Sequence, residues 1–167
     1  MPSDAVLYQA AALCLTYPDE DFFARLQLLR EAAPQLRRFT DHAALTPPQE
    51  LAAHYAEVFD SKSRHSLYLS RWHDGDTRHH GMSLGRFKDA YRAHGLELSG
   101  EELPDFLPAV LEFTARTGDT ELLTEYRDGL ERLRRRLTGH GTPYAAVLDA
   151  VCAALPTVRS GRTGMRP

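Results

Sequence analysis

Apolar residues recur every three or four positions along most of this chain, and prolines and glycines interrupt the pattern repeatedly. This spacing places apolar side chains on one face of an α-helix, whereas a half-buried β-strand needs strict alternation. Residues 67–72 could form a short strand by composition, but no segment of the chain is a candidate partner strand. The pattern therefore predicts an all-α protein.

Seven segments carry the helical pattern, and we interpret them as six or seven helices packed into a single helical bundle. They cover residues 5–17, 18–33, 47–59, 77–94, 105–118, 120–138 and 142–155. Residues 67–72 are expected to form a loop or a short helical turn. A kink is expected near residues 103–108, because Pro104 lies too deep for a helix that begins at Ser99.

A chain of 167 residues suffices for one domain with a real core, which we place at residues 1–155. Residues 156–167 contain three arginines and no acid, and we expect this basic tail to be disordered. The net charge is −3, so residues 1–155 carry −6. An acidic body argues against nucleic acid as a partner and favours a basic one.

No run of 18 apolar residues occurs, and the N-terminus lacks the order of a signal peptide, so we expect a cytoplasmic protein. Cys14 and Cys152 lie far apart and form no C-x-x-C motif. We interpret both as small buried apolar side chains rather than as a disulfide.

Gly81-Met-Ser83-Leu-Gly85 matches the G-x-S-x-G pattern of hydrolases. That pattern works by placing the serine on a sharp turn between a strand and a helix. Here no strand precedes it, so we do not expect Ser83 to act as a nucleophile.

Histidines and aspartates that could ligate a metal gather at the predicted turn near residue 75, namely His65, His73, Asp74, Asp76, His79 and His80. Adjacent residues on a helix point about 100° apart, and no H-x-x-x-H pair is present. Surface histidines are the preferred interpretation, and a helical metal-binding or regulatory interaction protein is the alternative.

Aromatic and apolar residues are concentrated in two predicted helices and the connection between them, at Tyr55, Phe59, Leu67, Tyr68, Leu69, Trp72, Phe87 and Tyr91. Most of them should belong to the core, but a helical domain can also leave an apolar groove for a partner helix. The nearby acids Glu57, Asp60, Asp74 and Asp76 would attract a basic peptide to such a groove.

Several of these residues stand in runs that resemble the NarJ branch of the redox-enzyme maturation proteins, the TorD/DmsD/NarJ family. The runs are Tyr55-Ala-Glu-Val-Phe-Asp60, Leu67-Tyr-Leu69, His73-Asp-Gly-Asp-Thr-Arg78, Gly81-Met82, Arg86-Phe-Lys88 and Glu102-Leu-Pro-Asp-Phe-Leu-Pro108. The family usually has histidine where this chain has Phe106.

The resemblance implies a helical chaperone that is not an enzyme, has no resident cofactor and binds no nucleic acid. The family binds the N-terminal leader-like segment of the nitrate reductase catalytic subunit and holds the subunit for molybdenum cofactor insertion. Its association with the membrane is transient and indirect. The peptide-binding residues expected here are Tyr55, Glu57, Phe59, Asp60, Leu67, Tyr68, Leu69, Trp72, Asp74, Asp76, Arg78, Phe87, Glu102, Pro104 and Asp105.

Overall fold

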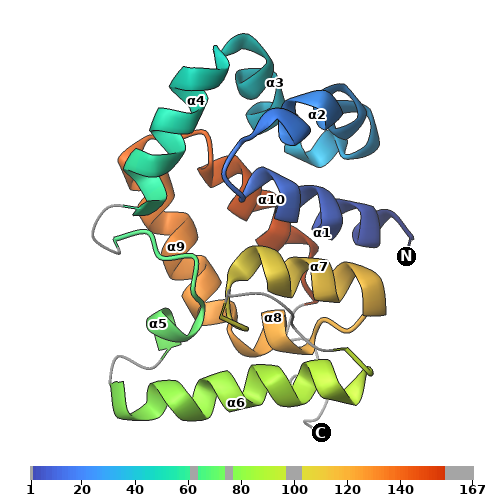
Figure 1. Cartoon of the computed structure of the whole chain (residues 1–167), viewed down its shortest axis with the longest axis vertical. Helices are drawn as coiled ribbons and strands as arrows, with labels where there is room; N and C mark the ends of the chain where they lie inside the picture. Colours follow the sequence, from blue (N-terminus) through green and yellow to red (C-terminus); the bar gives the residue numbers. More distant parts are fainter. Residues whose placement is uncertain (1, 61–63, 74–76, 97–102, 157–167) are drawn as a thin grey trace, which may run out of the picture.

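Helices make up most of the chain in the computed structural model, which describes residues 2–60, 64–73, 77–96 and 103–156 (Figure 1). Within these ranges there are ten α-helices, a 3₁₀-helix and a π-helix, and no β-strand. The all-α class predicted from the sequence is therefore confirmed. The elements in chain order are α1 (Pro2–Cys14), α2 (Glu20–Ala32), η1 (Pro34–Leu36), α3 (Arg37–Leu45), α4 (Pro48–Tyr55), η2 (Ala56–Asp60), α5 (Ser70–His73), α6 (Thr77–Ala93), α7 (Leu107–Thr117), α8 (Glu121–Glu125), α9 (Arg127–His140) and α10 (Ala145–Ala154).

The described part of the chain has more helical segments than the six or seven expected. No helix was expected between residues 33 and 47, where the structure has α3, which buries only Phe39, Thr40 and Ala43 of its nine residues. The single helix expected over residues 120–138 divides at Tyr126, whose φ of −101° and ψ of 23° are not helical. The short turn expected near residue 70 is α5.

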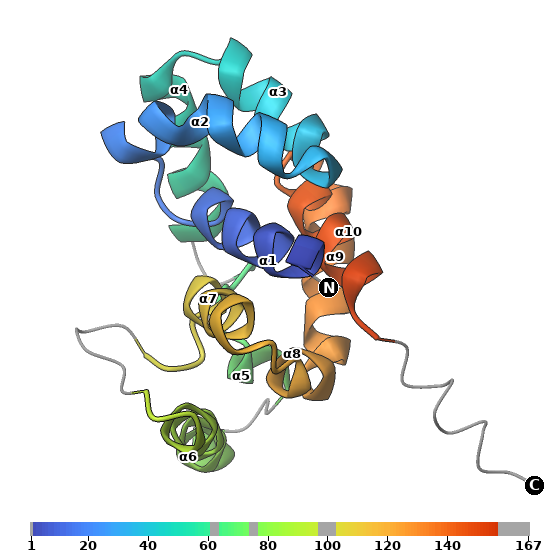
Figure 2. The same ribbon diagram turned by 90° about the vertical axis from the view of Figure 1, so that its right-hand side faces the viewer.

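α1 lies in the middle of the molecule, where it packs against α7 and α10 (Figures 1 and 2). Its buried face includes Leu7, Ala10, Ala11 and Cys14, which recur at helical spacing. Small side chains on this face allow the neighbouring helices to approach closely. The helix ends at Cys14, three residues earlier than expected, because the chain turns before Pro18.

The two cysteines are free and buried, as the sequence predicted. Burial raises the pKa of the Cys14 thiol to about 12, and burial is also the main reason that the pKa of Cys152 is raised to about 12. Both thiols therefore behave as apolar core groups.

α6 lies along one edge of the molecule, next to α8 (Figure 1). Phe87 packs on Tyr126 with ring centroids 4.8 Å apart, and Tyr91 packs on Phe113 at 4.9 Å. The Tyr91 hydroxyl also donates a hydrogen bond to the carbonyl of Pro104. These contacts hold the segment before α7, where the sequence predicted a kink.

No helix among the described residues is both long and apolar enough to cross a membrane. The expected domain boundary near residue 155 stays a prediction, because the basic tail from residue 157 onward lies outside the described residues.

Candidate functional site

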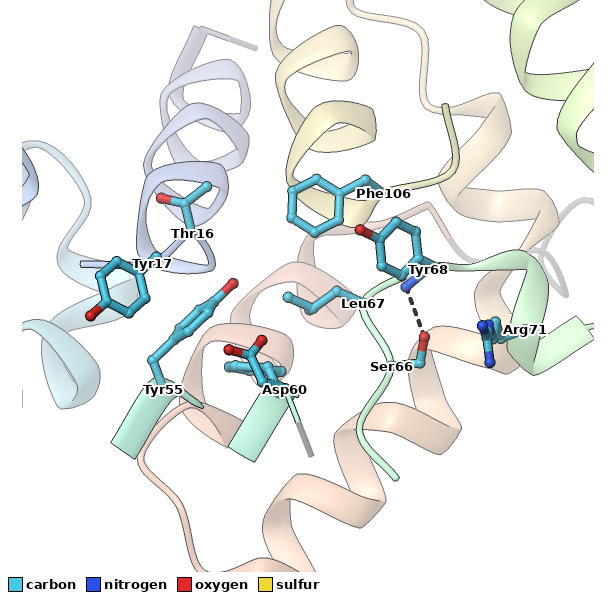
Figure 3. Close-up of a pocket in the computed structure, with 10 residues that line it drawn as sticks. Thr16, Tyr17, Tyr55, Asp60, Ser66, Leu67, Tyr68, Arg71 and Phe106 are labelled. Carbon is cyan, nitrogen blue, oxygen red and sulfur yellow. Dashed lines mark hydrogen bonds between the residues drawn. The ribbon is translucent and has the colours of Figure 1, made fainter. Parts of the chain in front are cut away.

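A pocket of about 530 Å³ opens beside the C-terminal end of α1 (Figure 3). Four stretches of chain that are distant in sequence meet around it. Its lining residues are Thr16, Tyr17, Tyr55, Phe59, Asp60, Ser66, Leu67, Tyr68, Arg71 and Phe106. Aromatic rings dominate the lining, which is typical of sites that bind apolar side chains. We call it the aromatic pocket.

The first wall joins the end of α1 to the end of α4. Tyr17 is 55% exposed, and its ring meets the ring of Tyr55 edge to face with centroids 5.8 Å apart. The Tyr55 hydroxyl donates a 2.9 Å hydrogen bond to the carbonyl of Leu15. Tyr55 therefore ties the two helices together while its ring remains in the pocket wall.

The second wall is the π-helix η2, which continues α4 and carries Phe59 and Asp60. A π-helix has one more residue per hydrogen-bonded turn than an α-helix, and such turns occur frequently at functional sites. The Phe59 ring lies 4.9 Å from the Tyr55 ring. Nδ1 of the buried His65 donates a 2.9 Å hydrogen bond to the carbonyl of Val58, inside the same turn.

The third wall is a pairing of two short segments, residues 66–69 and 104–107, around an isolated bridge between Tyr68 and Phe106. The amide of Leu69 donates to the carbonyl of Asp105 at 3.0 Å, and the amide of Leu107 donates to the carbonyl of Leu67 at 2.7 Å. Tyr68 and Phe106 face each other across this isolated bridge with ring centroids 5.1 Å apart, on the pocket side (Figure 3).

Asp105 fixes this wall from behind. Its side chain is completely buried, and Oδ2 accepts hydrogen bonds from the Ser70 hydroxyl at 2.6 Å and from the Ser70 amide at 3.1 Å. Among the described residues, Oδ1 has no hydrogen-bond partner. Because the buried carboxylate bonds to the first residue of α5, the position of α5 depends on the segment before α7.

The lining of the pocket includes one acidic and one basic side chain. Asp60 and Arg71 both line it and are both exposed. The other acids expected beside a groove are placed differently. Glu57 is exposed and lies near His54 and His140, at 3.9 Å and 3.7 Å. Asp74, Asp76 and Glu102 lie outside the described residues, as does the side chain of Arg78.

Five of the predicted site residues come together in the aromatic pocket, namely Tyr55, Phe59, Asp60, Leu67 and Tyr68. Leu69 and Phe87 are completely buried elsewhere, and Trp72 is 8% exposed and packs against α9. Pro104 and Asp105 are buried behind the third wall. The role of each in binding a partner stays a prediction.

Sequence reasoning did not assign five lining residues, namely Thr16, Tyr17, Ser66, Arg71 and Phe106. Tyr17 was expected inside the first helix, and nothing local indicates that it meets Tyr55. Phe106 was noted only because it replaces a histidine. An aromatic residue beside a proline-aspartate pair was the signal that could have identified it.

The alternatives gain no support from the described residues. The backbone of residues 81–85 is an uninterrupted part of α6, so the sharp strand-to-helix turn of a hydrolase is absent there. Within the described residues, no group of three or more histidine, cysteine, aspartate or glutamate side chains could hold a metal ion. Of the candidate ligands, the side chain of His65 alone is described, and it bonds to a backbone carbonyl.

The fold is that of a helical redox-enzyme maturation protein. A crystal structure described as a putative redox enzyme maturation protein from Archaeoglobus fulgidus superimposes with a TM-score of 0.71 over 92% of each chain, at 23% identity. The sequence profile described as "Nitrate reductase delta subunit" matches residues 25–150. The chain belongs to the nitrate reductase delta subunit family.

Curated relatives agree with this assignment. The chain is 28% identical to the probable nitrate reductase molybdenum cofactor assembly chaperone NarJ of Bacillus subtilis, over 92% of this chain and 90% of that one. It is 31% identical to NarJ of Escherichia coli, over 81% and 63%. The nitrate reductase-like protein NarX of Mycobacterium tuberculosis is 37% identical over 88% of this chain, but the chain spans 24% of that protein's length.

Proposed function

We propose that this protein is an assembly chaperone for respiratory nitrate reductase. In this proposal it binds the N-terminal segment of the catalytic subunit and holds that subunit while molybdenum cofactor is inserted. It acts in the cytoplasm, performs no catalysis itself, and leaves the subunit before the enzyme docks at the membrane. Family membership and the names of the NarJ relatives support the chaperone role.

The observation that carries the peptide-binding part is the aromatic pocket. Five aromatic side chains from four distant stretches of chain converge there, and several of them stand in the runs that resemble the family. A helical domain that leaves an apolar hollow between its elements can accept the apolar face of a partner helix. The pocket is large enough for a few side chains of such a helix.

The expected affinity follows from the size of the pocket. Burying about four apolar side chains contributes roughly 6–12 kcal/mol before other costs are counted. Loss of translational freedom and ordering of the peptide offset part of this gain. A net value of about −7 to −9 kcal/mol corresponds to a Kd near 1 μM, which suits a partner that must be released.

The test is calorimetric titration of the full chain with a synthetic peptide of the N-terminal segment of the same organism's nitrate reductase catalytic subunit. Tyr17→Ala removes the most exposed ring of the pocket, so we expect affinity to fall about tenfold with little change in stability. Leu45→Ala is the matched control, because Leu45 is 86% exposed and does not line the pocket.

No binding of the peptide by the folded wild-type chain would overturn the peptide-binding proposal. Equal losses in Tyr17→Ala and Leu45→Ala would place the peptide somewhere other than the aromatic pocket. The holding role has its own test in cells that lack the chaperone gene. There the catalytic subunit should accumulate without molybdenum cofactor, and the wild-type chain should restore the cofactor content.

A further inference from the structure

The arginines of α9 fall into two groups on opposite sides of the helix. Arg134 forms ion pairs with Glu131 at 2.9 Å and Asp149 at 3.3 Å, and Arg127 pairs with Glu131 at 3.9 Å. Arg132, Arg135 and Arg136 point to the other side, since positions three and four apart share a helix face. None of these three has an ion pair with any described acid.

Trp72 holds two of these arginines in place without neutralising them. The guanidinium carbons of Arg132 and Arg136 lie 5.6 Å and 5.4 Å from the centre of its ring. Nη1 of Arg132 also donates to the Trp72 carbonyl at 2.8 Å, and Nη1 of Arg136 donates to the Arg64 carbonyl at 3.4 Å. Cation–π and carbonyl contacts orient a guanidinium but leave its positive charge uncompensated.

The segment that packs on α9 adds two more exposed arginines, Arg64 and Arg71, and neither has an ion pair with a described residue. We call the set Arg64, Arg71, Arg132, Arg135 and Arg136 the arginine face. Elsewhere in the described part of the chain, two cations lack an ion pair, Lys88 on α6 and Arg116 on α7. Uncompensated positive charge is thus concentrated on one side of a protein whose net charge is −3.

The acids near the arginine face are few, and none of those described forms an ion pair with it. Glu131 precedes Arg132 but pairs with Arg127 and Arg134, and Asp128 is exposed one turn before Arg132. Asp60 lines the aromatic pocket with Arg71, and Glu57 lies 3.7 Å from His140 at the end of α9. A folded protein that keeps five arginines unpaired on one surface has a site ready for external carboxylates.

We propose that the arginine face binds an acidic segment of a protein partner, at a site separate from the peptide-binding role of the aromatic pocket. Guanidinium groups match carboxylates with paired hydrogen bonds, so glutamate and aspartate side chains fit this surface. The inference does not depend on what occupies the pocket, since Arg71 is the one residue that the two sites share.

Other polyanions fit the surface less well. A membrane would need apolar side chains to insert, yet none of the large exposed apolar residues that the structure describes is on α9 or α5. One of them, Tyr17, lines the aromatic pocket with Arg71. Single-stranded nucleic acid needs exposed rings for base stacking, and Trp72, the ring of this face, is buried. A short acidic segment also avoids the negative charge on the rest of the protein.

The experiment uses a fluorescein-labelled peptide of alternating glutamate and serine, with a lysine–serine peptide as the opposite probe. Fluorescence anisotropy with the full chain should show binding of the glutamate peptide that weakens as salt rises from about 0.02 M to about 0.15 M. The double variant Arg64→Glu/Arg135→Glu should weaken this binding about tenfold, because it reverses two charges of the arginine face. These two positions are chosen because the guanidinium groups over the Trp72 ring are those of Arg132 and Arg136, which the variant keeps.

The matched control is Lys88→Glu/Arg116→Glu, which changes the net charge by the same amount at two other unpaired cations. It should leave binding of the glutamate peptide within about twofold of wild type. Absence of binding at low salt, or equal weakening by both double variants, would overturn the proposal. So would phosphatidylglycerol vesicles that bind through the arginine face when the glutamate peptide does not. Circular dichroism would establish that each variant is folded.

Discussion

The Ser70 hydroxyl donates a 2.6 Å hydrogen bond to Oδ2 of Asp105, and both side chains are completely buried. The bond joins the first residue of α5 to a residue two positions before α7. The two residues are 35 positions apart in the sequence. Together with the backbone bonds of Leu69 and Leu107, it fixes the wall of the aromatic pocket that carries Tyr68 and Phe106.

Replacement of Asp105 should therefore be costly. Asp105→Ala removes the carboxylate that accepts from the Ser70 amide and hydroxyl, and we expect a loss of about 2–3 kcal/mol in the free energy of unfolding. Asp105→Asn keeps one acceptor oxygen and should lose less. Urea unfolding followed by circular dichroism measures both values, and an Asp105→Ala variant as stable as wild type would contradict the role given to this carboxylate.

Gly129 allows a close approach between α5 and α9. A Cβ atom at this position would lie 2.8 Å from Cβ of Trp72, which is too close without a shift of the backbone. Gly129→Ala should thus destabilise the protein by about 1–3 kcal/mol, although alanine favours the helix. Unfolding monitored by the fluorescence of the single tryptophan reports the loss.

Gly139 on the same helix is the matched control, because a Cβ atom there would meet nothing within 4 Å. Gly139→Ala should stabilise the protein by about 0.5–1 kcal/mol through helix propensity. Equal effects of the two alanines would show that α5 does not pack on α9 as closely as described.

The two charges of the aromatic pocket should have opposite effects on a basic peptide. Asp60→Lys should weaken binding of the leader peptide, and Arg71→Glu should strengthen it, each by about three- to tenfold. Both side chains are exposed, so stability should hardly change. Titrations at two salt concentrations measure the effect, and changes of the same sign would remove electrostatics as the source of selectivity.

Two histidines should make stability depend on pH. Burial lowers the pKa of His54 and of His65 below the ordinary value of 6.5, partly opposed by Glu57 for the first and by the Val58 carbonyl for the second. A histidine whose pKa is lower in the folded state binds protons more readily when unfolded. The contribution of these two histidines to the free energy of unfolding should be fully present above pH 6.5. It should decrease as the pH falls from 6.5 through the lowered pKa values.

Two variants test this dependence while keeping the hydrogen bonds. His54→Gln can still reach Thr142, which bonds to Nε2 of the histidine at 2.7 Å, and His65→Asn can still donate to the Val58 carbonyl. Thermal unfolding is measured at pH 7.5 and pH 5.5, about one pH unit on either side of 6.5. Between these two pH values the double variant should lose less stability than wild type. An unchanged pH profile would assign the acid sensitivity to other groups.

The fold class and part of the site could be predicted from the sequence, because both depend on local patterns. Helical spacing identified most helices, and α3 was missed because its nine residues bury few apolar side chains. Tyr55 and Phe59 were assigned from an aromatic run, but the same reasoning selected Phe87, which is core. Composition does not separate the two, because a ring in a pocket wall and a ring in the core are equally apolar.

The remaining features depend on contacts between distant segments. Nothing near Tyr17 indicates that it meets Tyr55, 38 positions later, and nothing near Phe106 indicates its pairing with Tyr68. Nothing in the sequence around Arg132, Arg134, Arg135 and Arg136 indicates that these arginines divide into two groups. Ion pairs with Glu131 and Asp149 on one side and the Trp72 ring on the other divide them.

The walls of the aromatic pocket come from residues 16–17, 55–60, 66–71 and 106. A ribosome must therefore have released the first two-thirds of the chain before any such hollow exists, and α7 must have folded to hold Phe106 in place. Under the proposed function, a copy that ends before residue 106 lacks one wall of the pocket and would not bind the leader peptide. Peptide binding would then depend on the folding of the chaperone itself.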